Sequence, residues 1–117
     1  MSQRTERVAD QIRIELSELF QRQVRDPRVR LASVTRVEVS RDLGLARIWI
    51  SVLGDESQRL AAMDGIEHAR GFLRSQLARR LNLRVTPELR FELDRGAEHL
   101  REISDLLDKL GGGQQES

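Results

Sequence analysis

The sequence contains no cysteine, and this absence removes two kinds of site at once. Disulfide cross-links and thiolate metal ligands are both excluded, which is typical of proteins that fold in a reducing compartment. His68 and His99 are the only histidines, and their separation does not resemble the spacing of a metal-binding pair. We therefore expect no disulfide framework, no metal centre and no cofactor.

Long apolar stretches are also missing. No segment approaches the roughly 20 apolar residues of a membrane-spanning helix, and residues 1–7 are not followed by the hydrophobic segment of a signal peptide. We expect a cytoplasmic protein that does not bind membranes. With 117 residues, 38% of them hydrophobic but only 3% aromatic, the chain is expected to form one domain with a mostly aliphatic core.

Charge is balanced overall but unevenly distributed. The net charge is +1, yet residues 1–84 carry 16 arginines against 11 acidic residues, and residues 85–117 carry four basic against eight acidic residues. Lysine occurs only once, at Lys109, and the other 19 basic residues are arginines. Arginine suits bidentate phosphate contacts and stacking on bases better than lysine does. A bias in genomic base composition would produce the same pattern, so both explanations stay open.

The spacing of apolar residues predicts an α+β domain. A period near 3.6 indicates helices, and strict alternation indicates strands. The predicted elements are a helix over 3–24, strands over 31–39 and 46–52, a kinked helix over 57–82, a strand over 89–94 and a helix ending at Gly111. The first two strands form an antiparallel hairpin, and in the first of them Thr35, Val37 and Val39 are predicted to share the core face. We predict a three-stranded sheet covered on one face by helices, the last one included, with 111–117 as a disordered tail.

The helical segment 57–82 does not fit one straight helix. Its apolar stripe consists of Leu60, Met63, Ile66, Ala69, Leu73, Leu77 and Leu81. On a straight helix Arg70 falls inside this stripe and Phe72 falls outside it. A break near Ala69-Arg70-Gly71 corrects both positions, and glycine tolerates backbone angles that other residues avoid. The sequence therefore predicts two helices joined at a kink.

A kink gives the second helix its own N-terminus, where unpaired N–H groups and a partial positive charge favour phosphate. Arginines flank the kink and continue beyond it, at Arg70, Arg74, Arg79, Arg80 and Arg84. Three more, Arg25, Arg28 and Arg30, lie around Pro27 and could also contact phosphate. The alternative is structural: a packing glycine, a solvated arginine face and a solvated loop. The residues alone leave both interpretations open.

Two further positions, Trp49 and Asp42, lie on the predicted strands and in the turn between them. Trp49 lies on the strand face opposite Ile48 and Ile50, where it could stack on a base or simply be a half-exposed tryptophan. Asp42, in the turn between the first two strands, is interpreted as a cap for its own backbone, as aspartate commonly is in turns.

Several stretches resemble known proteins. Ala69-Arg70-Gly71 is similar to the Ala-x-Gly variant of the K-homology domain, an RNA-binding module that usually carries a Gly-x-x-Gly loop. Four other stretches, in order and spacing, resemble the bacterial ribosome-binding factor A family. They are Arg7-Val-Ala-Asp10, Arg25-Asp-Pro-Arg-Val29, Val37-Glu-Val-Ser-Arg-Asp-Leu43 with Ala46, and Gly71-Phe-Leu-Arg-Ser75 running on to Leu83-Arg-Val-Thr-Pro-Glu-Leu89.

The resemblance implies a single type II K-homology domain over residues 3–110 and a monomeric, non-enzymatic assembly factor without a small-molecule substrate. It further implies binding to the immature small (30S) ribosomal subunit, with 16S rRNA and neighbouring ribosomal proteins as partners. The resemblance also implies that the protein supports processing and folding of the rRNA 5′ region and late maturation of the subunit. It implies a role in cold adaptation as well. The candidate RNA-binding residues are then Ala69, Arg70, Gly71, Arg74, Arg79, Arg80, Arg84, Arg28 and Arg30.

Two other functions are weighed against this one. An enzyme is disfavoured because the sequence shows no nucleophile–base arrangement, no phosphate-binding loop and no metal cluster. The remaining alternative is a protein–protein adaptor on another ribonucleoprotein, without direct RNA contact.

Overall fold

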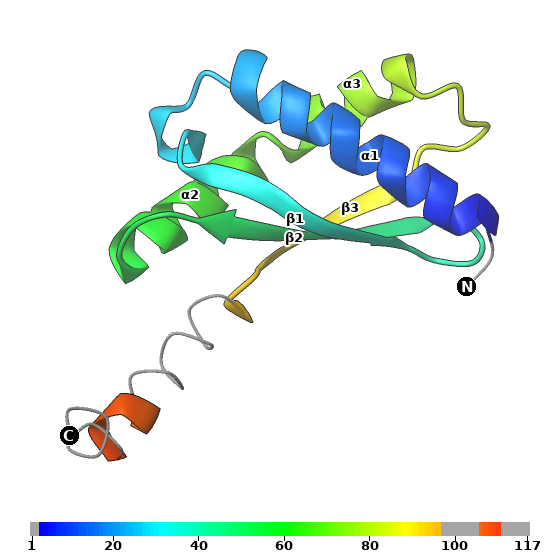
Figure 1. Ribbon diagram of the computed structural model, residues 1–117. Helices are drawn as coiled ribbons and strands as arrows, with labels where there is room; N and C mark the ends of the chain where they lie inside the picture. The colour runs from blue at the N-terminus through cyan, green and yellow to red at the C-terminus, as the bar shows by residue number, and fades with distance from the viewer. Residues whose placement is uncertain (1–2, 97–105, 111–117) are drawn as a thin grey trace.

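The computed structural model describes residues 3–96 and 106–110. Its elements, in chain order, are α1 (Gln3–Arg22), the 3-10 turn η1 (Pro27–Val29), β1 (Ala32–Val39), β2 (Leu45–Val52), α2 (Glu56–His68), α3 (Arg70–Arg80) and β3 (Glu88–Leu93). The strands form one sheet in the order β1-β2-β3, and the three helices lie on one of its faces (Figure 1). This confirms the predicted α+β fold, in the order expected for a type II K-homology-like domain.

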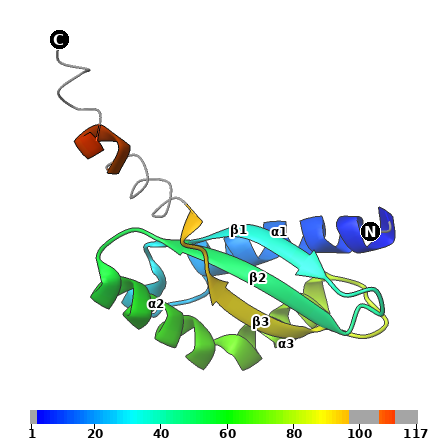
Figure 2. The ribbon, with the colours of Figure 1, turned by 90° about the horizontal axis from the view of Figure 1, so that it is seen from below.

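The sheet combines two kinds of strand pairing. β1 runs antiparallel to β2, with Val37 opposite Ile48, and β3 runs parallel to β2, with Phe91 beside Ile48. A parallel pair cannot be joined by a tight turn, so the chain must cross over between the two strands. α2 and α3 form that crossover (Figure 2). The kinked pair of helices is therefore joined to the sheet at both ends, through β2 and β3.

The core lies between the sheet and the helices. Alternate residues of β2 are buried, and Ile48 and Ile50 have no exposed surface, which confirms the predicted strand face. α1 contributes Ile12, Leu16 and Leu19, which are also fully buried. Burial of each such side chain favours folding by about 1.5–3 kcal/mol. The aliphatic core predicted from composition is therefore confirmed.

A bulge in β1 corrects one prediction. Val34 pairs with Ile50, but the next paired residue is Arg36, opposite Trp49, so Thr35 is extra. A bulge shifts the alternation of side chains by one residue, and Thr35 is exposed instead of facing the core. Its hydroxyl donates to the carboxylate of Asp94, with 2.7 Å between the oxygens. The donated hydrogen bond holds the pKa of Asp94 below its usual value.

Aspartates organise two of the connections. Asp42 accepts hydrogen bonds from the Ser40 hydroxyl (2.7 Å) and the Gly44 N–H (2.9 Å), which lowers its pKa and confirms it as a cap. Asp26 accepts from the Arg28 N–H at the start of η1, whose first residue is Pro27. Proline suits that position because its missing N–H would have no helical partner.

The predicted final helix is described only at residues 106–110. These residues are helical, but Leu106, Leu107 and Leu110 are 57%, 59% and 74% exposed. The predicted covering role is therefore wrong for this part, and the rest of the predicted helix and the tail 111–117 lie outside the described residues.

Candidate nucleic-acid interface

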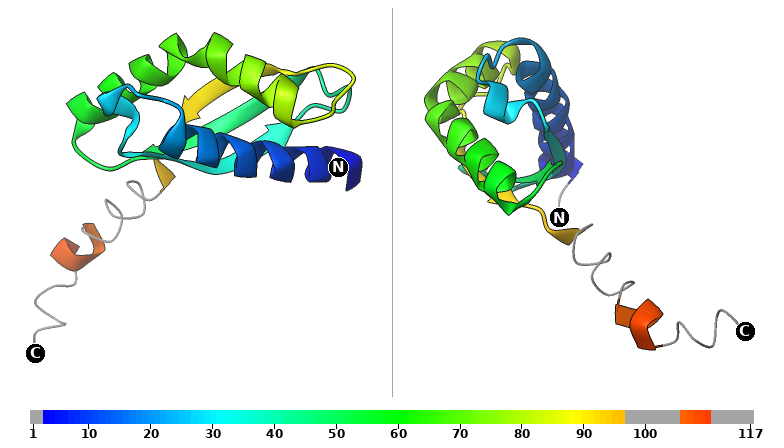
Figure 3. Two further views of the ribbon diagram at one scale, coloured as in Figure 1. Left: turned by 90° about the horizontal axis from the view of Figure 1, so that it is seen from above. Right: turned by 90° about the vertical axis from the view of Figure 1, so that its left-hand side faces the viewer.

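The predicted kink is confirmed, and it lies at Ala69. This residue ends α2 and begins α3, with φ −87° and ψ 0°. Its N–H donates to Gly65 O (3.1 Å) and Ile66 O (3.0 Å), and its own carbonyl accepts from Leu73 N (2.8 Å). Figure 3 shows α2 and α3 following different directions beside α1. Within the described part of the chain no side chain caps α3, so its first N–H groups have no side-chain acceptor there.

Gly71 is not the cause of the break. It lies in the first turn of α3, and its φ is not in the left-handed region. A Cβ built on it would meet no atom within 4 Å. The interpretation that the conformational freedom of this glycine makes the break easy is therefore wrong. What Gly71 provides instead is exposed backbone without a side chain, at the uncapped start of a helix.

The kink corrects only part of the misfit in the apolar stripe. Arg70 returns to solvent, and Leu73, Leu77 and Leu81 are buried as predicted. Phe72, however, remains 43% exposed, and Leu60 is 59% exposed. The side chain of Phe72 is therefore only partly buried, at the edge of the core.

Two of the predicted phosphate-binding arginines support the fold. Arg80 forms ion pairs with Glu15 (3.2 Å) and Glu18 (3.0 Å) of α1, and these hydrogen bonds raise its pKa. Arg74 donates to the carbonyls of Thr86 (2.8 Å) and Pro87 (3.1 Å), just before β3. These contacts favour the structural interpretation for both side chains.

Two other candidates also have acidic partners. Arg28 forms ion pairs with Asp26 (2.6 Å) and Asp64 (2.7 Å), which raise the pKa of Arg28 and lower that of Asp26. Arg70 pairs with Glu67, one turn earlier on α2. Both guanidinium groups are partly exposed, but each must give up or share a carboxylate partner to bind phosphate.

The other three candidate arginines have no side-chain partner among the described residues. The side chains of Arg30, Arg79 and Arg84 are exposed and form no hydrogen bond or ion pair within residues 3–96 and 106–110. They do not form one cluster, because η1, which precedes Arg30, and the C-terminal end of α3 lie at opposite ends of the domain (Figure 1). The structure thus brings together the kink residues and separates the free arginines into two groups.

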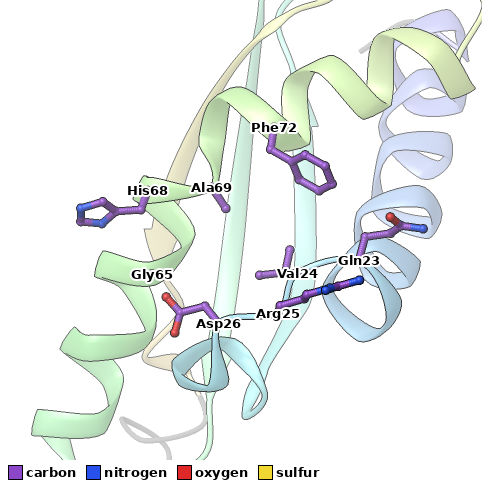
Figure 4. Close-up of a pocket in the computed structure, with 8 residues that line it drawn as sticks. All are labelled: Gln23, Val24, Arg25, Asp26, Gly65, His68, Ala69 and Phe72. Atoms are coloured by element: carbon purple, nitrogen blue, oxygen red, sulfur yellow. The ribbon is translucent and has the colours of Figure 1, made fainter.

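An open groove beside the kink was missed by sequence reasoning. It has a volume of about 280 Å³ and lies between the loop that joins α1 to η1 (residues 23–26), the C-terminal end of α2 and the start of α3 (Figure 4). Its lining residues are Gln23, Val24, Arg25, Asp26, Gly65, His68, Ala69 and Phe72. The misfit of Phe72 in the helical stripe was the one signal of this groove in the sequence.

Gly65 is the packing glycine of the α2–α3 segment. It is buried, and a Cβ there would lie 3.0 Å from Asp26 Oδ2 and 3.1 Å from Val29 Cγ2. The absence of a side chain lets η1 approach α2 closely, which also brings Arg28 to Asp64. The structural role considered for Gly71 thus belongs to a glycine six positions earlier.

Trp49 is covered by the protein's own arginines. The guanidinium carbons of Arg36 and Arg47 lie 3.9 Å and 4.8 Å from the centre of its ring. Arg47 is held there by Glu92, at 2.7 Å. Because cation–π contacts already occupy the ring, the structure favours a half-exposed tryptophan over a base-stacking site.

The described residues contain no cluster of side chains that could hold a metal ion. Within the same ranges, no helix combines the length and apolar character needed to cross a bilayer.

Comparison with known proteins gives consistent matches. The family model described as Ribosome-binding factor A matches residues 4–107. Ribosome-binding factor A of Thiobacillus denitrificans is 46% identical over 105 residues, which cover 90% of this chain and 85% of that protein. The solution NMR structure of a putative ribosome binding factor A from Thermotoga maritima has a TM-score of 0.71 at 35% identity, covering 82% of this chain and 92% of that chain.

A third comparison concerns a complex. A homology model of Thermus thermophilus ribosome binding factor A, fitted into a cryo-EM map of a 30S complex with that factor, has a TM-score of 0.62 at 29% identity. The match covers 74% of this chain and 90% of that chain.

Proposed function

The chain belongs to the ribosome-binding factor A family, and on that premise we propose that it binds the immature small ribosomal subunit through 16S rRNA. The observation that carries the proposal is the similarity to a Thermus thermophilus relative fitted into a map of its 30S complex. In this proposal the protein acts as a monomer in the cytoplasm and catalyses no reaction. It supports processing and folding of the rRNA 5′ region and late maturation of the subunit, and it helps growth in the cold.

The kink and the free arginines support RNA contact. At the uncapped start of α3, the N–H groups of Arg70, Gly71 and Phe72 carry the partial positive charge of the helix end. Without a side chain at Gly71, an RNA phosphate can approach this backbone closely. Arg79 and Arg84, exposed and unpaired among the described residues, add charge further along the same helix and just beyond it.

Sedimentation of cell extract tests the proposed partner. We expect the protein in the small-subunit fractions, enriched in those whose 16S rRNA is still unprocessed. Protein that stays at the top of the gradient would contradict the proposal. Binding of purified 16S rRNA, stripped of ribosomal proteins, separates direct RNA contact from the adaptor alternative, in which only the complete particle binds.

Salt dependence tests the role of the free arginines. Each phosphate contact that is lost makes the slope of log K against log salt shallower by about 0.7–0.9. We expect the Arg79→Gln/Arg84→Gln double variant to bind subunits more weakly and with a shallower slope. Arg90→Gln, on the exposed side of β3, is the control, because it removes one arginine charge elsewhere on the surface; the effect is compared per charge removed. Equal changes in slope per charge for the double variant and the control would show that these arginines only solvate the surface.

A further inference from the structure

Phe72 has a large apolar side chain that is partly exposed to solvent. It is 43% exposed, although its neighbour Leu73 is fully buried. In Figure 4 its ring points from α3 into the groove, toward the side formed by Gln23 and Arg25. The ring therefore presents a flat apolar surface at the edge of the groove.

The groove combines an apolar wall with polar groups at its rim. Val24, Ala69 and the backbone of Gly65 line it together with Phe72, and Gln23 and Arg25 stand opposite the ring (Figure 4). At about 280 Å³ it is just below the range for small-ligand pockets, which begins at about 300 Å³. This is room for one flat ring system and is too little for a helix of a partner protein.

The charge of the groove favours an anionic ligand. Arg25 is exposed and has no hydrogen-bond or ion-pair partner within the described part of the chain. The one carboxylate of the lining, Asp26, is already bound by Arg28, with contacts of 2.6–3.0 Å. The side chains of Arg22 and Arg30, before and after this segment in the chain, are likewise exposed and without such a partner among the described residues.

We propose that this groove receives one unpaired nucleotide of the bound RNA, with its base packed on Phe72 and its phosphate held by Arg25. The inference rests on the proposed function, because it assumes that the protein binds rRNA directly. An unpaired nucleotide is the fitting ligand since bases in a duplex keep both faces stacked, whereas unstacked bases are recognised by aromatic side chains. The amide of Gln23, opposite the ring, can donate to and accept from the edge of the base.

The experiment compares variants of Phe72 in binding to small subunits and to short RNAs, one set single-stranded and one set fully paired. Phe72→Leu keeps an apolar side chain and removes the stacking surface, whereas Phe72→Tyr keeps the ring. Since stacking contributes about 1–3 kcal/mol per base, we expect Phe72→Leu to bind single-stranded RNA roughly 5- to 150-fold more weakly, and Phe72→Tyr to bind normally. Leu60→Ala, which removes an exposed apolar side chain of α2 outside the groove, is the control and should not change affinity.

A second measurement reports on the ring itself. In a Trp49→Phe/Phe72→Trp variant the only tryptophan lies at the groove, and stacking of a base should quench its fluorescence. We expect quenching by single-stranded RNA, less quenching when Arg25→Gln is added, and none by paired RNA.

The outcomes separate this proposal from the proposed function. Normal RNA affinity of Phe72→Leu, or no quenching on RNA binding, would overturn the groove proposal and leave rRNA binding intact. Subunit binding that survives in Phe72→Leu but falls in Phe72→Ala would show that an apolar protein side chain occupies the groove, which also overturns the proposal. Wild-type protein that binds neither 16S rRNA nor any RNA probe would instead contradict the proposed function itself.

Discussion

Replacing Gly71 by alanine distinguishes the contribution of this residue to stability from its contribution to RNA binding. The backbone of Gly71 is in the first turn of α3 without a positive φ, and a Cβ there meets nothing within 4 Å. The added methyl group therefore introduces no clash and no strain. Alanine also restricts the unfolded chain more than glycine does, which favours the folded state.

The expected gain can be estimated from these features. Glycine to alanine at a compatible helical position stabilises by about 0.4–1 kcal/mol. In a domain of this size 1 kcal/mol moves the thermal midpoint by roughly 3–6 °C. We expect Gly71→Ala to raise the midpoint by about 1–6 °C. Ser75→Ala, an exposed position one turn further along α3, is the matched control, because it also improves helix propensity.

The same variant should bind small subunits less well. If an RNA phosphate approaches the backbone at the start of α3, the methyl group stands between them, whereas Ser75→Ala leaves that approach unchanged. Thermal unfolding and subunit affinity, measured for both variants, check the two expectations. A lower midpoint for Gly71→Ala would refute the structural argument, and a raised midpoint with unchanged affinity would refute the role of Gly71 in binding.

Three further predictions concern other contacts. Gly65→Ala should lower the free energy of unfolding by about 1–3 kcal/mol through overpacking against Val29, and a denaturant midpoint equal to the wild type would contradict this. Arg80→Gln should lower the thermal midpoint by removing the ion pairs to α1, whereas Arg79→Gln should not; equal midpoints would show that the ion pairs add nothing. The lowered pKa of Asp42 stabilises the fold above its unfolded pKa, near 4, and this contribution is lost as the pH falls through the folded value. Asp42→Asn should therefore lose less stability between about pH 5 and pH 2, and a profile parallel to the wild type would argue against it.

Local patterns were sufficient to predict most of the fold. Alternation in β2 and helical spacing in α1 follow directly from which residues face the core, so Ile48, Ile50 and Leu16 were placed correctly. The misfit of Arg70 located the kink to within one residue. The bulge at Thr35 was not predictable in this way, because it depends on the pairing of β1 with β2 and not on β1 alone.

The site was predicted less completely than the fold. Arg79 and Arg80 are adjacent and chemically alike, yet only Arg80 meets carboxylates, and those come from α1, more than 60 residues away in the chain. Ion pairs between residues so far apart in the chain cannot be predicted from the residues next to either partner. Gly65 was overlooked for a related reason: its need for a small residue comes from the approach of η1 and not from its own helix.

The parallel pairing of β2 with β3 also determines when the sheet is completed during folding. The Arg47–Glu92 ion pair, which spans the two strands, joins residues 45 positions apart, and closing so long a loop is slow compared with forming a hairpin or a helix. α1, β1 and β2 can assemble from neighbouring segments, and Arg80 links α3 to α1, but the sheet that α3 covers is complete only when β3 docks. During synthesis β3 follows both helices of the crossover, so a nascent chain that has released every residue from Glu56 to Arg80 still lacks the strand that completes the sheet.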